Sequence, residues 1–341
     1  MLKAVLEKPF KIKLLGSDVL APKRKEVLIK VLVAGICGSD LHAYRGTQPF
    51  ISYPRVLGHE IAGEIAEIGE DVKGRRKGDL VTVDPVFSCG KCYACRVGRR
   101  NCCRDVKVLG VHVDGGFSEY ITVPSNIVYE APPDVPPEIL ALTEPLSIGV
   151  QANNRGNICG EDKVAILGAG TIGLASLLIA KNRNCKVIVA DFIPNRLKLA
   201  KELGADRIVN VREEDLTEVV TEFTKEDGAS VVIEATGSSQ AVEDSIRIVS
   251  PAGRIVILGL TNKSVSISPV ELIRKELDFR GSRLNNKLFP YTLGLLPSIE
   301  DKVRKLITDE FHIKDINAAF ELLDKHSEKV IKVLLAFTRS H

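Results

Sequence analysis

Four cysteines in one short stretch have the spacing of a metal site. Cys89, Cys92 and Cys95 are separated by two residues each, and Cys103 follows seven residues later. Thiolates at this spacing can surround one zinc ion tetrahedrally and leave no position open for chemistry, which is typical of structural zinc. The residues between them are mostly polar or charged, which disfavours four free cysteines in an apolar core. Cys102 adjoins Cys103, so spacing alone leaves the fourth ligand ambiguous.

Arginines in the same stretch allow a second interpretation. Arg96, Arg99, Arg100 and Arg104 lie among the cysteines, as they would in a zinc ribbon that binds nucleic acid. Solvated side chains that balance the thiolate charge are the simpler interpretation. The whole chain has 47 Lys+Arg against 44 Asp+Glu, a net charge of +3, which is too small for the electrostatic footprint of a nucleic-acid binder. We therefore expect a small-molecule partner and no nucleic acid.

A glycine-rich turn predicts a nucleotide site. The sequence Gly168-Ala169-Gly170-Thr171-Ile172-Gly173 follows an apolar run and opens a segment with helical periodicity. Glycines let such a turn tighten and let the backbone approach a pyrophosphate at the helix N-terminus. Asp191 ends the next apolar run, where a carboxylate can bind ribose hydroxyls and would repel a 2′-phosphate, so NAD is expected rather than NADP. A turn without a nucleotide, with Asp191 as a simple cap, is the alternative.

The elements that carry these residues change in character along the chain. Short runs rich in Val, Ile and Leu, separated by Gly, Pro and Asp, predict an all-β, barrel-like unit; examples are Glu26–Val33, Glu64–Ile68 and Leu80–Val83. Beyond a proline cluster at residues 132–137, apolar strands alternate with helical stretches, which predicts βαβ units and a parallel sheet. The run Lys329–Phe337 predicts a final strand.

Length and composition agree with an ordinary globular protein of two domains. The chain has 341 residues, of which 45% are hydrophobic and 27% charged. The segment Met1–Gly16 has no apolar stretch of the kind that a secretory signal needs, and we expect no membrane segment. Five of the eight cysteines lie between Cys89 and Cys103, which favours metal binding in a reducing compartment over disulfides. These features predict a cytoplasmic protein.

A dispersed set of residues carries a family resemblance. Cys37 lies in Gly35-Ile36-Cys37-Gly38-Ser39-Asp40, and the segment Gly58-His59-Glu60-x2-Gly63-x5-Gly69-x2-Val72 resembles the motif of the zinc-containing alcohol dehydrogenases. The cysteine stretch and the glycine turn follow in that family's order, so the resemblance spans essentially the whole chain. It implies an α/β protein with a GroES-like β-barrel catalytic domain, residues 1–146 and 282–341. A Rossmann coenzyme domain with a doubly wound parallel sheet would comprise residues 147–281.

Further segments resemble one branch of that family. Leu142-Thr143-Glu144-Pro145-Leu146 carries glutamate, as in the sorbitol, threonine and sugar-acid dehydrogenases. Residues 53–60, 110–120 and 281–285 look like the L-galactonate and L-gulonate 5-dehydrogenases. The implied activity is zinc-dependent transfer of hydride from a secondary alcohol of such an aldonate, or of a polyol, to NAD. A sorbitol- or L-threonine-type dehydrogenase is the alternative, and a zinc-ribbon binding or regulatory protein is the alternative from another class.

The resemblance assigns a second, catalytic zinc ion to dispersed residues, so that two zinc ions per chain are expected. Cys37 and His59 would hold it together with one or both of Glu60 and Glu144, leaving an open position for the alcohol. By the same resemblance, Ser39 takes the alcohol proton and passes it through the nicotinamide ribose to His42, while Asp40 orients His59. Ser39 and Asp40 could alternatively cap a helix that begins at Leu41.

The family pattern also suggests residues around the coenzyme and the substrate. Arg196 would lie beside the adenosine, Thr236 and Leu258 near the nicotinamide, and Arg283 near the coenzyme. Tyr44, Phe50 and Phe117 are candidates for the substrate pocket, with ordinary core packing as the alternative. A sugar acid needs a cation for its carboxylate, and Arg45 and Arg283 are the candidates, although an exposed salt bridge is the simpler expectation for Arg45. Relatives of this branch suggest a homotetramer, or a dimer, with a pairing edge near Arg254–Leu260.

Overall fold

The computed structural model describes residues 1–337. Its internal contacts divide the chain into a first unit, Met1–Glu144 together with the chain from Asn285 onward, and a second unit, Pro145–Leu284. The resemblance predicted domain boundaries after residues 146 and 281. In the structure the boundaries lie after residues 144 and 284.

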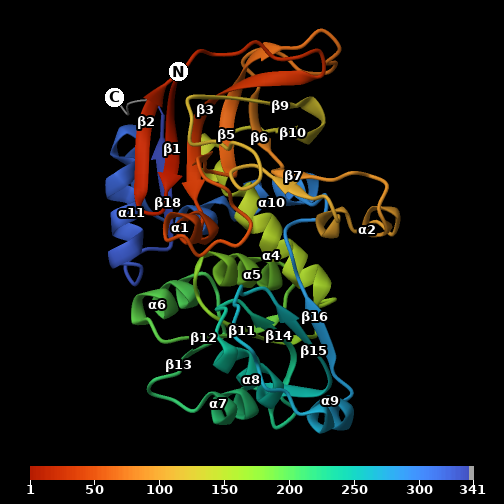
Figure 1. Cartoon of the computed structure of the whole chain (residues 1–341). Coiled ribbons are helices and arrows are strands. Elements are labelled where there is room, and N and C mark those ends of the chain that lie inside the picture. Colours follow the sequence, from red (N-terminus) through yellow and green to blue (C-terminus); the bar gives the residue numbers. More distant parts are fainter. Residues whose placement is uncertain (338–341) are drawn as a thin grey trace. The chain divides into compact units, whose positions relative to one another are not determined.

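The first unit is built around a mostly antiparallel seven-stranded sheet. Its order is β10-β6-β5-β3-β18-β17, and β9 also pairs with β3. The strands are β3 (Glu26–Ile36), β5 (Glu60–Ile68), β6 (Leu80–Val83), β9 (Tyr120–Pro124), β10 (Val128–Glu130), β17 (Ile307–His312) and β18 (Lys332–Ala336). Figure 1 shows β18, from the end of the chain, beside strands from its beginning, and Val333 lies opposite Ile36 in β3.

Smaller sheets and helices complete the first unit. The small sheets are β2-β1-β4 and β7-β8, with β1 (Leu2–Lys8), β2 (Lys11–Gly16), β4 (Arg55–Val56), β7 (Val86–Phe87) and β8 (Lys107–Val108). The helices are α1 (Gly38–Tyr44), α2 (Tyr93–Arg96), α3 (Pro137–Ala141), α10 (Phe289–Arg304) and α11 (Ile316–Lys325). The core combines alternate strand residues with apolar residues of α1 and α11, such as Ile29, Ile61, Val333 and Phe320.

The second unit is a six-stranded, wholly parallel sheet. Its order is β13-β12-β11-β14-β15-β16. The strands are β11 (Lys163–Leu167), β12 (Lys186–Asp191), β13 (Arg207–Asn210), β14 (Ala229–Glu234), β15 (Val249–Ile257) and β16 (Asp278–Gly281). The helices are α5 (Thr171–Asn182), α6 (Pro194–Glu202), α7 (Leu216–Thr224), α8 (Ser239–Ile248) and α9 (Pro269–Lys275), while α4 (Thr143–Arg155) leads into the unit.

The order of this sheet confirms the predicted βαβ organisation. The first strand, β11, lies in the middle, and the chain builds outward from it in one direction and then in the other. Ligands of such sheets bind at the carboxyl ends of the strands, at the point where the order of the strands reverses. Here that point lies between β11, from which the chain continues to β12, and β14, to which it returns.

The edge of the sheet differs from the expectation. The segment near Arg254–Leu260 begins within β15, which pairs with β14 on one side and β16 on the other. The edge strand on this side of the sheet is therefore β16, because the short run Asp278–Gly281 adds one more strand.

No helix within residues 1–337 combines the length and the apolar character needed to cross a bilayer.

Candidate functional site

The position of Cys37 follows from the end of strand β3. The strand stops at Ile36, and Cys37 is the N-cap of α1 with extended backbone angles. The Asp40 carboxylate, at the third position of the helix, accepts a hydrogen bond from the Cys37 amide at 2.9 Å. Asp40 is 1% exposed, and burial raises its pKa, although the nearby His59 opposes this shift. The expected capping role of Asp40 is therefore present, in a helix that begins at Gly38 rather than Leu41.

His59 is brought beside Cys37 by a tight turn before β5. Gly58 precedes it with φ +95°, a conformation that favours glycine, and a Cβ at Gly58 would lie 2.4 Å from the ring of Phe117. Donor atoms of Cys37, His59 and Glu60 all lie within 4.8 Å of one another. The His59 Nδ1 atom is buried without a hydrogen-bond partner and lies 3.7 Å from Asp40 Oδ1. Asp40 therefore faces the side of the imidazole that it was expected to orient.

Two buried carboxylates belong to this region. Glu60 is fully buried, and both of its oxygens accept hydrogen bonds from Lys332, at 2.7 and 2.8 Å. Glu144 is 4% exposed; burial raises its pKa to about 7, His59 opposes the shift and Glu60 reinforces it. Glu144 is not part of the group of donor atoms within 4.8 Å.

The donor set fits a zinc ion. A thiol, an imidazole and a carboxylate are all zinc ligands, and catalytic zinc sites typically use three such groups and keep one position open. Asp40, whose Oδ1 lies 3.7 Å from His59 Nδ1, is the kind of carboxylate that orients a metal-bound histidine through its other nitrogen. Cys37, His59 and either Glu60 or Glu144 can therefore hold the metal.

The two expected proton-relay residues both lie on helix α1. The Ser39 hydroxyl oxygen is 3.5 Å from His59 Nε2, which places it next to a candidate metal ligand. His42 lies nearer the end of the helix, is exposed, and pairs its Nδ1 with the Thr47 hydroxyl at 3.0 Å. Partial burial, with a contribution from Arg45, lowers the pKa of His42. A neutral imidazole at pH 7 can accept a proton and release it to water.

The aromatic candidates for the substrate pocket differ in their surroundings. Phe117 is 1% exposed, and its ring packs 6.3 Å from that of Phe320 in the core. Tyr44 lies 5.0 Å from the same ring. Phe50, by contrast, is 54% exposed and stacks on His112. Packing accounts for Phe117 and Tyr44, and Phe50 is left as the accessible aromatic candidate.

Of the two arginines considered for a substrate carboxylate, Arg45 already has a protein partner. Its Nε donates to Asp324 Oδ1 at 2.6 Å, and a second nitrogen donates to the Asp324 carbonyl. Arg45 therefore forms a salt bridge, which was the simpler expectation from the sequence. Arg283 is an exposed residue of the second unit.

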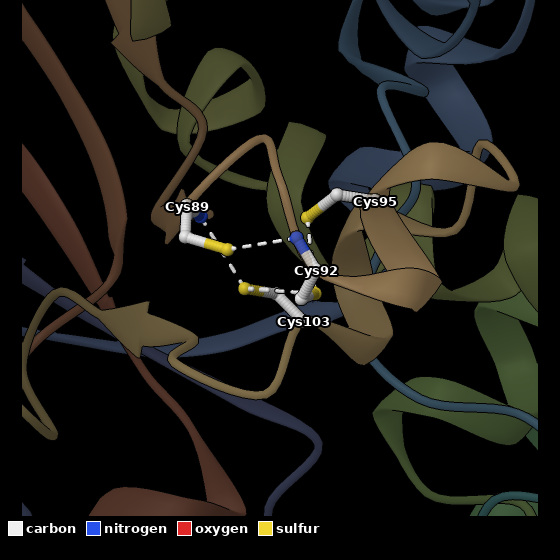
Figure 2. A group of neighbouring side chains, drawn as sticks. All are labelled: Cys89, Cys92, Cys95 and Cys103. Carbon is white, nitrogen blue, oxygen red and sulfur yellow. Dashed lines mark hydrogen bonds between the residues drawn. The ribbon is translucent and has the colours of Figure 1, made fainter.

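The four cysteines converge in one lobe of the first unit. Figure 2 shows Cys89, Cys92, Cys95 and Cys103 facing a common centre, and their sulfurs all lie within 4.8 Å of one another. Backbone amides of Arg104 and Cys95 lower the pKa of Cys92 to about 6, which favours the thiolate that a metal needs. Cys102 lies outside this group, so the geometry resolves the ambiguity in favour of Cys103.

One arginine of this lobe is not a solvated surface charge. Arg100 pairs with Asp84, which is fully buried, and also donates to the carbonyl of Val86. Asn285, at the return of the chain into the first unit, donates to the same Asp84 at 3.1 Å. The interpretation of all four arginines as solvated is therefore wrong for Arg100, which ties the lobe to the core.

The glycine turn of the second unit has the geometry of a phosphate-binding site. Gly168 follows β11 with φ +100°, and a Cβ at Gly173 would lie 1.8 Å from the Gly168 carbonyl. Gly170 is the N-cap of α5 and has no side-chain cap, and the nearest atom to a Cβ there would be a guanidinium nitrogen of Arg196, at 3.9 Å. Thr171 and Ile172, which begin the helix, are partly exposed. A helix N-terminus that follows a glycine turn suits the pyrophosphate of a dinucleotide.

Asp191 closes the turn from the end of β12. Its Oδ2 accepts from the Ala169 amide at 2.7 Å, and its Oδ1 accepts from the amides of Phe192 and Ile193. The side chain is 8% exposed. A carboxylate has about four acceptor sites, so one remains for a ligand hydroxyl. Asp191 therefore holds the turn in addition to its expected role toward ribose.

The remaining coenzyme candidates of the second unit lie near the ends of neighbouring strands. A guanidinium nitrogen of Arg196 is 3.9 Å from the position of a Cβ at Gly170. Thr236 follows β14, and its amide and hydroxyl donate to Glu234. The Leu258 amide donates to the Glu234 carbonyl at 2.9 Å. Glu234 thus connects the two segments expected near the nicotinamide.

Two buried residues of these sites, Lys332 and Glu234, were missed from the sequence. Lys332 lies within the run predicted as the last strand, where a lysine between Ile331 and Val333 could have been noticed. Glu234 ends an apolar run in the same way as Asp191, and this similarity could have marked it as a candidate site residue.

Comparisons with known proteins agree with both units. Residues 23–133 match the family model "Alcohol dehydrogenase GroES-like domain", and residues 171–298 match "Zinc-binding dehydrogenase". The "Starvation-sensing protein RspB" of Escherichia coli K12 is 39% identical over 340 residues, covering 99% of this chain and 100% of the relative. The "L-galactonate-5-dehydrogenase" of the same organism is 39% identical over 268 residues, 78% of each chain.

A solved structure is similar over nearly the whole length. It is described as a "short chain alcohol dehydrogenase (rspB)" from E. coli CFT073 complexed with NADH. The TM-score is 0.94 at 38% sequence identity, with 99% of each chain covered.

Proposed function

The chain belongs to the zinc-binding alcohol dehydrogenase family, and we propose that it oxidises a secondary alcohol of a sugar acid, such as L-gulonate or L-galactonate, with NAD. That it is an NAD(P)-dependent alcohol dehydrogenase follows from the family and the two matched domains. The observation that carries the catalytic proposal is the convergence of Cys37, His59 and Glu60, with Ser39 beside the imidazole.

The residues divide the chemistry between them. Zinc, when bound, supplies a Lewis acid that polarises the alcohol oxygen, and NAD accepts the hydride. Ser39 would accept the proton of the alcohol while its own hydroxyl proton moves through the nicotinamide ribose to His42. His42, on the exposed part of α1, would then release a proton to water. Asp40 fixes the start of that helix and faces His59, so it positions both the thiol and the imidazole. The four-cysteine lobe holds the second zinc ion and serves the fold.

The sugar-acid proposal depends on the similarity to an L-galactonate-5-dehydrogenase over 78% of this chain and on the resemblance of residues 53–60, 110–120 and 281–285. A carboxylate substrate needs a cation, since two buried acids already lie near the proposed metal. The resemblance offers Arg45 and Arg283 as arginine candidates, and Arg45 pairs with Asp324.

A substrate panel tests this proposal. Aldonates, neutral polyols and L-threonine are compared by the rate of NADH formation at equal enzyme and metal content. We expect turnover of L-gulonate or L-galactonate, and Arg283→Met should raise KM for the acid while leaving activity on polyols nearly intact. Oxidation of sorbitol or L-threonine with neither acid oxidised would discard the sugar-acid assignment and keep the dehydrogenase.

We also propose a homotetramer in which the free edge strand β16 is one pairing surface. Support comes from apolar side chains exposed on β16 and the preceding helix, where Phe279 is 40%, Val270 64% and Ile273 78% exposed. An exposed strand edge next to exposed apolar residues favours association. Light scattering that returned a particle of the 37.2 kDa chain mass would contradict this proposal.

A further inference from the structure

Glu234 is a fully buried carboxylate at the end of strand β14. Its side chain is 0% exposed. One oxygen, Oε1, accepts hydrogen bonds from the amides of Thr236 and Gly237, at 2.7 and 2.9 Å, and from the Thr236 hydroxyl. The other oxygen, Oε2, is buried and has no hydrogen-bond partner among residues 1–337. A buried carboxylate is costly unless hydrogen bonds offset the loss of water, so the donors of this turn are what stabilises it there.

The place of Glu234 in the sheet is one where a residue can act on a dinucleotide. A doubly wound sheet binds the two halves of a dinucleotide on the two sides of the point where the strand order reverses. Asp191 ends β12 on one side, and Glu234 ends β14, the first strand on the other side. Since Asp191 is expected at the ribose of the adenosine half, the turns after β14 and β15 are expected at the nicotinamide half.

Glu234 holds these two turns together. Its carboxylate accepts from the turn after β14, as described above. Its backbone carbonyl accepts from the turn after β15, through the amides of Leu258 and Gly259, at 2.9 and 3.3 Å. The two turns are in close contact, because a Cβ at Gly259 would lie 2.0 Å from the Gly237 nitrogen and 2.7 Å from Glu234 Oε2. A shift of one turn must therefore move the other.

Asp191 shows how a carboxylate in the other half differs. Asp191 also accepts from backbone amides of its own turn, but it is 8% exposed and keeps an acceptor site for a ligand hydroxyl. Glu234 is fully buried, so it acts on a coenzyme through the two turns and not by direct contact.

We propose that Glu234 is a positioning residue that fixes the turns after β14 and β15 in the geometry that binds the nicotinamide half of the coenzyme. This inference rests on the proposed function, because it assumes that Thr236 and Leu258 lie near the nicotinamide. Without the carboxylate, the amides of Thr236 and Gly237 lose their acceptor, and the turn should leave this conformation for part of the time. The apparent dissociation constant of a ligand rises as the fraction of protein able to bind it falls.

The test separates the two halves of the coenzyme. Wild type, Glu234→Gln and Glu234→Ala are titrated with NADH, followed by its fluorescence, and then with ADP, which displaces NADH but has no nicotinamide. All titrations are made well below the melting temperature of each variant.

Asp162→Ala is the matched control. Asp162 is a carboxylate of the same unit that is 6% exposed and accepts from an amide, that of Cys159, and from a hydroxyl, that of Ser230. It directly precedes β11 and therefore lies at the opposite end of the parallel sheet. Asp162→Ala should lose thermal stability and leave the affinities for NADH and ADP unchanged.

We expect Glu234→Ala to raise the dissociation constant of NADH about 10–100-fold and that of ADP less than about 3-fold. Glu234→Gln keeps an acceptor oxygen without the charge. Since a neutral hydrogen bond is about half as strong as a charged one, its dissociation constant for NADH should rise about 3–10-fold. Equal weakening of NADH and ADP, or affinity for NADH within about two-fold of wild type in both variants, would overturn the proposal.

Glu234→Gln keeps the test decisive if Glu234→Ala does not fold, because unchanged affinity for NADH in this variant alone would overturn the proposal. Asp191→Ser provides the opposite case, since it should weaken ADP as well as NADH. The measurement needs no substrate, so failure of the sugar-acid assignment leaves it intact. Wild-type protein without affinity for NADH would overturn the proposed oxidation with NAD, which distinguishes that failure from failure of the role of Glu234.

Discussion

Replacement of Asp191 by serine should affect both the coenzyme preference and the stability of the second unit. The carboxylate accepts three backbone hydrogen bonds, from Ala169, Phe192 and Ile193, at 2.7 to 2.9 Å. A hydrogen bond to a charged group contributes about 1.5–3 kcal/mol, and serine can replace at most part of this set. We expect a loss of roughly 2–4 kcal/mol in the free energy of unfolding.

The effect on coenzymes follows from the remaining acceptor site. A lost charged hydrogen bond to the ribose of NAD should raise KM for NAD by about 10–100-fold, since each 1.4 kcal/mol is a factor of ten. Without the carboxylate, a 2′-phosphate is no longer repelled, so KM for NADP should fall. The assay is steady-state kinetics with both coenzymes at one fixed alcohol concentration, alongside thermal melting without coenzyme.

Asp162→Ser is the matched control at the opposite end of the same sheet. Asp162 is 6% exposed against 8% for Asp191, and it also bonds a backbone amide, that of Cys159. Burial raises the pKa of Asp162, but hydrogen bonds from Cys159 and Ser230 and the charge of Arg254 outweigh it and lower the pKa. The control should lose stability without a change in coenzyme preference. An unchanged ratio of kcat/KM for NAD and NADP in Asp191→Ser would refute the assignment of Asp191 to the ribose.

Other predictions concern the metals and pH. Cys37→Ser should lose one zinc ion per chain and turnover while melting close to wild type; full activity would contradict the catalytic site. Cys92→Ser should lose the other zinc ion and melt at a lower temperature, because structural zinc contributes folding free energy, whereas Cys102→Ser should retain it. The lowered pKa of Asp162 predicts stabilisation above about pH 4 that is lost as pH falls through the folded-state pKa. The difference in melting temperature between wild type and Asp162→Asn should therefore shrink in acid; a constant difference from pH 7 to pH 3 would contradict this.

Features with short sequence spacing were the most predictable. The four cysteines lie within one short stretch, and the glycine turn lies directly between a strand and a helix. The spacing of the residues along the chain therefore determines the geometry of both features. The run Leu80–Val83 predicts β6 with the same bounds. The helices α10 and α11 of the first unit were not predicted, because the segment that contains them has mixed character. Their packing partners, α3 for α10 and α1 for α11, lie far away in the sequence.

The environment of the catalytic site depends on strand order, which local patterns do not encode. Glu60 and Lys332 are 272 positions apart, and they meet because β18 adds to β3 on the side opposite β5. A lysine inside an apolar strand could equally have pointed to solvent, and only the glycine at position 35 makes room for the carboxylate that it binds. The sequence could therefore name Glu60 and Glu144 as possible ligands but offered no reason to choose between them. Only the three-dimensional arrangement shows that Glu60 is neutralised by a buried ammonium, and a carboxylate paired in this way has less charge to offer a metal.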